Sequence, residues 1–274
     1  MSQDGTSQNG SQPEPLLRLG GMALKNGLLV HGPTSWAAAA RAPEGTIRVA
    51  SGRKPTLPGP ASSIPGLRGP LRLAEGFAFI PIARRELPVA RLPFEDLRVL
   101  VAAIVATALS AGIRKGRAPL AVREALAAGL GLMPALIALR GSELAAYHGV
   151  EHKAIGGYER GVPAADVAKE HERCGSHLVA PMLAFSLLGQ LVVERLVEEP
   201  GRSARGLAAL GGVSAAVELF VWSERNPDHP LARAFRRPGT EIQRVFATKE
   251  PTSEQMEVGS AALDEILRAE GVKA

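Results

Sequence analysis

The sequence predicts a mainly α-helical protein, with a small β-containing module before the helices and an amphipathic helix at the C-terminal end. Two observations indicate this fold class. Four long apolar segments rich in Ala, Leu and Gly occupy the middle and second half of the chain, as is typical of buried or membrane helices. The part before them is rich in Gly and Pro and holds short strand-like pieces, which favours turns and strands there.

The composition divides the chain into four parts. Residues 1–15 are too polar to bury a core, and we expect a disordered tail. We assign 16–93 to the β-containing module, 94–224 to a helical domain with a site segment at 147–177, and 225–274 to a C-terminal tail with a terminal helix. The first residues lack a basic start followed by an apolar stretch, so we expect no secretory signal there.

The N-terminal module contains a predicted β-hairpin. Residues 36–41 and 46–50 are strand-like, and the Pro- and Gly-containing sequence 42–45 lies between them as a turn. Residues 54–70 are rich in turn residues, and we expect irregular structure there.

The four apolar segments are 99–113, 125–139, 178–193 and 206–222. Each is shorter than the ~20 apolar residues of a typical membrane span, so their length leaves a soluble bundle of Ala-rich helices open. With four spans, the N-terminal module, the site segment and the C-terminal tail share one side. The many arginines of that side place it in the cytoplasm, although the linker 114–117 (RKGR) opposes this orientation.

The end of the chain predicts one more helix. Residues 226–239 form a polar, Pro-rich connection. Thr252 followed by Gln255 has the pattern of a capping box, and an apolar face with Met256, Leu263 and Ile266 follows. We interpret this segment as a docking helix without chemistry of its own.

The overall charge narrows the class of partner. The chain has 32 Lys and Arg against 27 Asp and Glu, a net charge of +5. The arginines are scattered and rarely interleaved with aromatic residues, so we expect no nucleic acid, and a lipid bilayer is the expected partner. The sequence leaves open whether the chain forms a homo-oligomer. The single Cys excludes an intramolecular disulfide.

The segment Tyr147–Lys153 (YHGVEHK) is the strongest chemical signal. On a helix, His148 and His152 lie one turn apart on one face, with Glu151 beside them. This arrangement offers two imidazoles to one metal ion and keeps a carboxylate near a metal-bound water. The order His-x-x-Glu-His is that of the inverted zinc-protease motif.

A second pair follows. A short helical stretch expected at 164–172 brings His171 and Cys174 into range, and they can supply two further ligands. We therefore expect a divalent metal, zinc first, held by His148, His152, His171 and Cys174, with Glu151 as general base or as a partner that orients an imidazole. Cys174 as a nucleophile with His171 or His148 as base, and a metal-free buried polar network, are the alternatives.

Two outlying acids are additional candidates. Glu159 continues the face of His148 and His152, although Gly156 and Gly157 weaken the helix before it. Glu218 lies inside the fourth apolar segment, where an ionisable residue is costly in a membrane and therefore indicates a remote ligand or a proton carrier. In a soluble protein, Glu218 would reach the surface or cap the core.

The motifs together resemble the YqhQ-like family of bacterial membrane proteins, a family of unknown function described as predicted metal-dependent enzymes. The string 147–159 (YHGVEHKAIGGYE) and the later HERCG carry the resemblance, with the Gly-rich opening 20–33 and the closing 248–258 (TKEPTSEQMEV) at either end. The chain departs from the family at Asn26, where Glu is usual, and at His31, where Arg is usual.

The resemblance implies an integral membrane four-helix core with the site between the second and third helices, in the bacterial inner membrane. It also implies that His148, Glu151, His152, Glu159, His171, Cys174 and Glu218 are positions that the family tends to keep. The expected function is a metal-dependent, hydrolytic enzyme whose site faces the cytoplasm. The alternative is a non-catalytic scaffold or transporter-like module in which the His/Cys/Glu cluster is structural.

Overall fold

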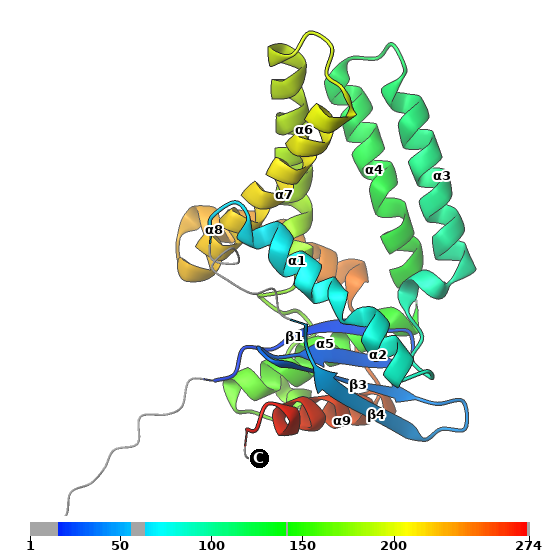
Figure 1. Ribbon diagram of the computed structural model, residues 1–274. Coiled ribbons are helices and arrows are strands. Elements are labelled where there is room, and N and C mark those ends of the chain that lie inside the picture. Colours follow the sequence, from blue (N-terminus) through cyan, green and yellow to red (C-terminus); the bar gives the residue numbers. More distant parts are fainter. Residues whose placement is uncertain (1–15, 56–63, 141, 273–274) are drawn as a thin grey trace, which may run out of the picture.

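The computed structural model describes residues 16–55, 64–140 and 142–272, with the side chains of Arg68 and Arg72 left aside. Two pairs of long helices extend from one end of the molecule, and a small sheet with its covering helices forms the other end (Figure 1). The tail expected at 1–15 lies outside the described residues.

The sheet is a four-stranded antiparallel meander in the order β1-β2-β3-β4. Arg41 pairs with Ile47 across the turn between the last two strands, which confirms the predicted hairpin. The strands are β1 (Gly20–Leu24), β2 (Gly27–His31), β3 (Ser35–Arg41) and β4 (Ile47–Arg53).

Helices cover both faces of the sheet. The alternation of side chains along a strand puts Leu28 on one face, against α5 (Glu143–Arg160) and α9 (Ser253–Ala269), and Leu29 on the other, against α2 (Ile80–Glu86). The four consecutive alanines of β3 divide between the two faces in the same way. Each buried Leu contributes about 1.5–3 kcal/mol of apolar burial.

Two helices between the sheet and the membrane-length helices were not expected. The region 54–70 was predicted to be irregular, but α1 (Arg68–Ala78) begins inside it, and α2 follows directly. Ile80 and Ala83 of α2 are buried on the sheet. Tertiary burial therefore stabilises a helix that its own short sequence does not predict.

The four predicted apolar segments are helices long and apolar enough to cross a membrane. They are α3 (Leu97–Arg114), α4 (Leu120–Leu139), α6 (Val179–Leu196) with the 3₁₀ turn η4 (Gly175–Leu178) before it, and α7 (Arg202–Arg225). Helix α3 packs on α4, α6 packs on α7, and α4 contacts α6. Large apolar side chains such as Ile104 (60% exposed) and Leu188 (55% exposed) point outward, as lipid-facing side chains do.

The C-terminal region adds a helix to the expected Pro-rich connection. Helix α8 (Pro230–Ile242) begins with a proline in its first turn, a position that tolerates it, and also contains Pro238. It continues into one π-helical turn, η5 (Gln243–Ala247). The capping box of α9 is confirmed, because Thr252 and Gln255 exchange side-chain-to-backbone hydrogen bonds.

These connections bring distant parts of the chain to one place. Strand β1, α5, the loop 161–174 and η5 meet near the site-side end of α4 and the start of α6 (Figure 1). The helical stretch expected at 164–172 is only the 3₁₀ turn η3 (Ala164–Asp166), and the chain is irregular from there to Cys174.

Candidate metal centre

Helix α5 carries the two histidines at the predicted spacing. Ser142 caps its first turn by accepting a hydrogen bond from the amide of Ala145, and Gly161 ends it in a left-handed conformation. His148 and His152 therefore lie one above the other, with ring centroids 4.4 Å apart. His152 is only 2% exposed.

Backbone carbonyls fix the orientation of both rings. Nδ1 of His148 lies 2.8 Å from the carbonyl oxygen of Ala247, and Nδ1 of His152 lies 2.5 Å from that of Lys169. Because a carbonyl only accepts hydrogen bonds, each Nδ1 carries the proton and each Nε2 presents a lone pair. Metal-binding histidines in proteins are oriented by contacts of this kind.

The two histidines lie beside Cys174. Nε2 of His148 lies 3.4 Å from Sγ of Cys174. Nε2 of His152 is buried and has no hydrogen-bond partner among the described residues. One ring nitrogen of each histidine and the sulfur of Cys174 all lie within 4.8 Å of one another, so this buried group could hold a metal ion.

Burial keeps His152 and Cys174 uncharged. It lowers the pKa of His152 to about 2 and raises the pKa of Cys174 to about 11. A neutral imidazole is the form that binds a metal, whereas the thiol must lose its proton on binding. The cysteine is the N-cap of η4 and its sulfur accepts a weak hydrogen bond from the amide of Ser176, at 3.5 Å.

Glu151 is partly buried beside this group, beneath β1. A Cβ atom at Gly21 would lie 2.7 Å from Cγ of Glu151, so only glycine lets the strand approach this closely. Burial raises the pKa of Glu151, while His148 and a backbone hydrogen bond from Ala23 lower it. A carboxyl group with a raised pKa is suited to proton transfer near neutral pH.

His171 lies next to the group, but both of its ring nitrogens have other partners. Its ring centroid is 5.6 Å from that of His152. Nε2 lies 3.2 Å from the carboxylate of Glu159, and Nδ1 accepts a hydrogen bond from the amide of Arg173. Glu159 also forms an ion pair with Arg173. Both predicted residues, His171 and Glu159, therefore lie in a neighbouring polar cluster.

Glu218 is placed elsewhere. It lies on α7, and its Oε1 accepts a hydrogen bond from the amide of Gly66, at 3.1 Å. This contact links α7 to the segment before α1. Glu218 does not belong to the group formed by His148, His152 and Cys174 among the described residues.

The sequence did not indicate Gln243, which holds the loop in place. Its fully buried side chain accepts a hydrogen bond from the amide of His171, at 2.7 Å, and donates to Oγ of Ser176, at 2.8 Å. It lies in the π-helical turn that also presents the carbonyl of Ala247 to His148. Such turns are frequent at functional sites, but a lone Gln in a polar stretch gives no sequence signal.

The closing segment after η5 packs tightly on α5. A Cβ atom at Gly149 would clash with the carbonyl oxygen of Lys249, whose amide donates to the carbonyl of Ala145 at 2.9 Å. Nζ of the buried Lys153 lies 2.6 Å from the carboxylate of Glu250. Because Gly149, between His148 and His152, has no side chain, the closing segment can approach α5. This close approach brings the carbonyl of Ala247 within hydrogen-bond distance of His148.

Two cavities meet at the group. One, of about 350 Å³, is bordered by His148, Glu151 and Cys174 at one end. The other, of about 170 Å³, is bordered by Glu151, His152 and Cys174, and also by Arg173 and His171. Glu151 and Cys174 belong to both cavities, so the candidate ligands are part of the wall between them.

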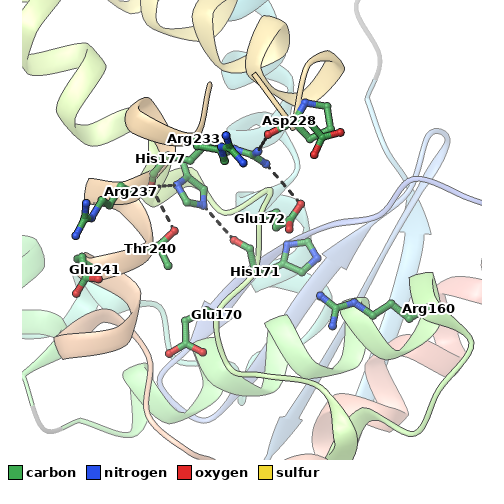
Figure 2. Close-up of a pocket in the computed structure, with 12 residues that line it drawn as sticks. Arg160, Glu170, His171, Glu172, His177, Asp228, Arg233, Arg237, Thr240 and Glu241 are labelled. Carbon is green, nitrogen blue, oxygen red and sulfur yellow. Dashed lines mark hydrogen bonds and ion pairs between the residues drawn. The ribbon is translucent and has the colours of Figure 1, made fainter. Parts of the chain in front are cut away.

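A third, charged cavity of about 610 Å³ lies on the far side of His171, between the loop and α8 (Figure 2). His177 also borders it. Its charges have both signs, and Arg236 contacts Glu172 at 3.5 Å. The charged residues that line it are Arg160, Arg233, Arg236 and Arg237, with Glu170, Glu172, Asp228 and Glu241.

Comparison with known proteins agrees with the resemblance seen in the sequence. Residues 142–269 match the model of a family described as "Protein of unknown function (DUF1385)". The "Uncharacterized protein YqhQ" of Bacillus subtilis (strain 168) is 28% identical over 135 residues, which are 46% of this chain and 41% of that protein. The chain thus matches less than half the length of this relative. No solved structure matches.

Proposed function

The chain carries a DUF1385 domain at residues 142–269, and we propose that it is a multi-pass bacterial inner-membrane protein with a metal-dependent hydrolytic centre on the cytoplasmic side. The proposed ligands are His148, His152 and Cys174. Zinc is the proposed metal, because two imidazoles and one thiolate suit its preference for nitrogen and sulfur.

The observation that carries this proposal is the buried Nε2 of His152, which has no hydrogen-bond partner among the described residues. An unsatisfied buried polar atom costs about 1–3 kcal/mol. The contact of Nδ1 with Lys169 rules out a protonated Nε2 in the neutral ring. A metal ion shared with His148 and Cys174 satisfies this lone pair.

The residues around the group support hydrolysis. A bound divalent metal lowers the pKa of a coordinated water toward neutrality. Three protein ligands would leave a coordination position open to water, as in catalytic rather than structural zinc sites. Glu151, with its pKa raised by burial, holds the proton taken from the nucleophile and returns it to the leaving group.

The charge distribution supports a cytoplasmic site. The end that carries the site holds many basic residues, among them Arg84, Arg91 and Arg140. The basic linker 114–117 at the opposite end is partly neutralised, because the side chain of Arg114 lies 3.1 Å from both carboxylate oxygens of Glu124.

A metal-free polar network without a catalytic role is the second candidate, favoured by one observation. With a pKa of about 11, the Cys174 thiol keeps its proton and can donate it to Nε2 of His148, 3.4 Å away. The same raised pKa weighs against Cys174 as a nucleophile, because the thiolate is the reactive form. Metal content separates the two candidates.

The test is elemental analysis of protein purified in detergent without added metal. We expect about one zinc per chain in the wild type, and loss of the zinc in His152→Ala and in Cys174→Ser. His229→Asn is the matched control, because His229 is exposed and caps α8 away from the site, and Asn is also a good N-cap. Metal-free wild-type protein that is fully folded would overturn the proposal.

A further inference from the structure

The cavity of about 350 Å³ is lined by both polar and apolar residues, and we call the part lined by the apolar residues its apolar end. Its polar groups, His148, Glu151, Cys174 and Ser176, belong to the candidate metal centre or lie next to it. The rest of the lining is apolar or glycine, and comes from β1, the turn before α3, the end of α4, the start of α5 and the start of η4. These residues are Gly21, Met22, Ala23, Pro93, Ala135, Ala138, Leu139, Leu144 and Gly175.

The apolar end lies at the boundary of the membrane-length helices. Leu139 is the last residue of α4, and Pro93 begins the 3₁₀ turn η2 (Pro93–Glu95) just before α3. Both therefore lie at the site-side end of the α3–α4 pair, where the proposed membrane spans end. The neighbouring side chains of Phe94 and Leu97 are 55% and 71% exposed.

We infer that the substrate is an amphipathic molecule whose alkyl chain enters this cavity from the bilayer. The inference rests on the proposed function and adds the substrate class to it. An alkyl chain lying against Ala138 and Leu139 would bring its polar end toward His148 and Glu151, which line the same cavity. The volume lies at the lower end of the range for small-molecule sites.

The smaller cavity completes the arrangement. It lies behind the candidate ligands, is bordered by Arg173, His171 and His31, and shares Glu151 with the apolar cavity. At about 30 Å³ for each water molecule, its volume of about 170 Å³ holds a few waters. Because Glu151 lines both cavities, it can contact the polar end of the substrate in one and water in the other.

The experiment measures binding of alkyl hydroxamates, from acetohydroxamate to decanohydroxamate, to Co²⁺-substituted protein in one fixed detergent. A hydroxamate chelates the metal whatever its tail, and the visible absorption of Co²⁺ reports binding independently of activity. We expect the affinity to rise by up to about fourfold with each added methylene until the cavity is full, since burying a CH₂ contributes about 0.8 kcal/mol.

Variants separate binding in the cavity from partitioning into detergent. Ala138→Trp fills the apolar end, and we expect it to weaken decanohydroxamate binding by about tenfold or more while acetohydroxamate binds as before. Ala138→Leu is a smaller change, and we expect it to cause a smaller loss of decanohydroxamate affinity. It replaces Ala138→Trp as the test if the Trp variant does not fold. The control is Ala125→Trp, an exposed position on α4 outside the cavity lining.

The outcomes distinguish the inference from the proposed function. A Co²⁺-loaded protein that binds all chain lengths equally, or whose Ala138 variants lose nothing relative to Ala125→Trp, overturns the substrate class and leaves the metal centre standing. A folded protein that takes up no metal overturns the proposed function, and the inference with it. Chain-length dependence that disappears in the Ala138 variants supports the inference.

Discussion

At the residue scale, the candidate centre depends on groups that never touch a metal. Gln243 holds the backbone on both sides of Cys174 through His171 and Ser176, and the carbonyls of Lys169 and Ala247 set the tautomers of the two histidines. Contacts of this kind orient ligands and commonly change metal affinity by about 10–100-fold when lost. Metal affinity should therefore respond to Gln243, although Gln243 binds no metal.

We predict that Gln243→Leu lowers the zinc affinity by about 10–100-fold while the protein stays folded. The loss of the hydrogen bonds to His171 and Ser176 frees the loop that carries Cys174. Competition with a chromophoric chelator measures the affinity. Gln190→Leu is the control, because Gln190 bonds to the carbonyl of Arg205 between α6 and α7. Equal zinc affinities in the two variants would show that Gln243 does not orient the metal ligands.

The sequence predicts which residues are candidate metal ligands, but not which of them lie together in the structure. The spacing of His148 and His152 follows from helix geometry alone, and their convergence on Cys174 is found in the structure. His171 was expected in the same set, but its nitrogens contact Glu159 and the amide of Arg173. The direction of each histidine ring nitrogen depends on tertiary contacts with η5 and the loop 161–174. Those contacts leave no periodic pattern in the sequence.

At the element scale, the four apolar helices and the C-terminal helix α9 were predictable, whereas α1, α2 and α8 were not. The segments that form α3, α4, α6 and α7 are continuously hydrophobic over the length of a long helix. Such a pattern predicts a buried or membrane helix rather than a strand or a loop. Helices α1, α2 and α8 are short or Pro-containing. Their helical form depends on packing against the sheet and α7, so the local sequence alone does not predict these helices.

We predict that the chain remains in the membrane pellet after alkaline carbonate extraction and needs detergent for release. The four helices present large apolar side chains outward along their length, and about 20 residues of helix span the hydrocarbon core. Fractionation followed by immunoblotting measures this. A chain recovered in the carbonate supernatant would show that these helices form a soluble bundle.

At the scale of the whole molecule, four separated parts of the chain build one centre. Strand β1 covers Glu151, α5 supplies the two imidazoles, the following loop supplies the thiol, and η5 orients both loop and helix. The α3–α4 pair ends beside it, so the centre sits at the base of the membrane-length helices (Figure 1). The proposed reaction there would act on a molecule that stays partly in lipid.

The X-ray absorption spectrum of the metal, recorded at its K edge on protein as purified, tests the central claim most directly. Coordination by His148, His152 and Cys174 predicts two imidazole nitrogens, one sulfur and one further light atom around zinc, with Zn–N near 2.0–2.1 Å and Zn–S near 2.3 Å. The sulfur signal must vanish in Cys174→Ser. A spectrum without sulfur in the wild type, or one unchanged in His152→Ala, would contradict the account.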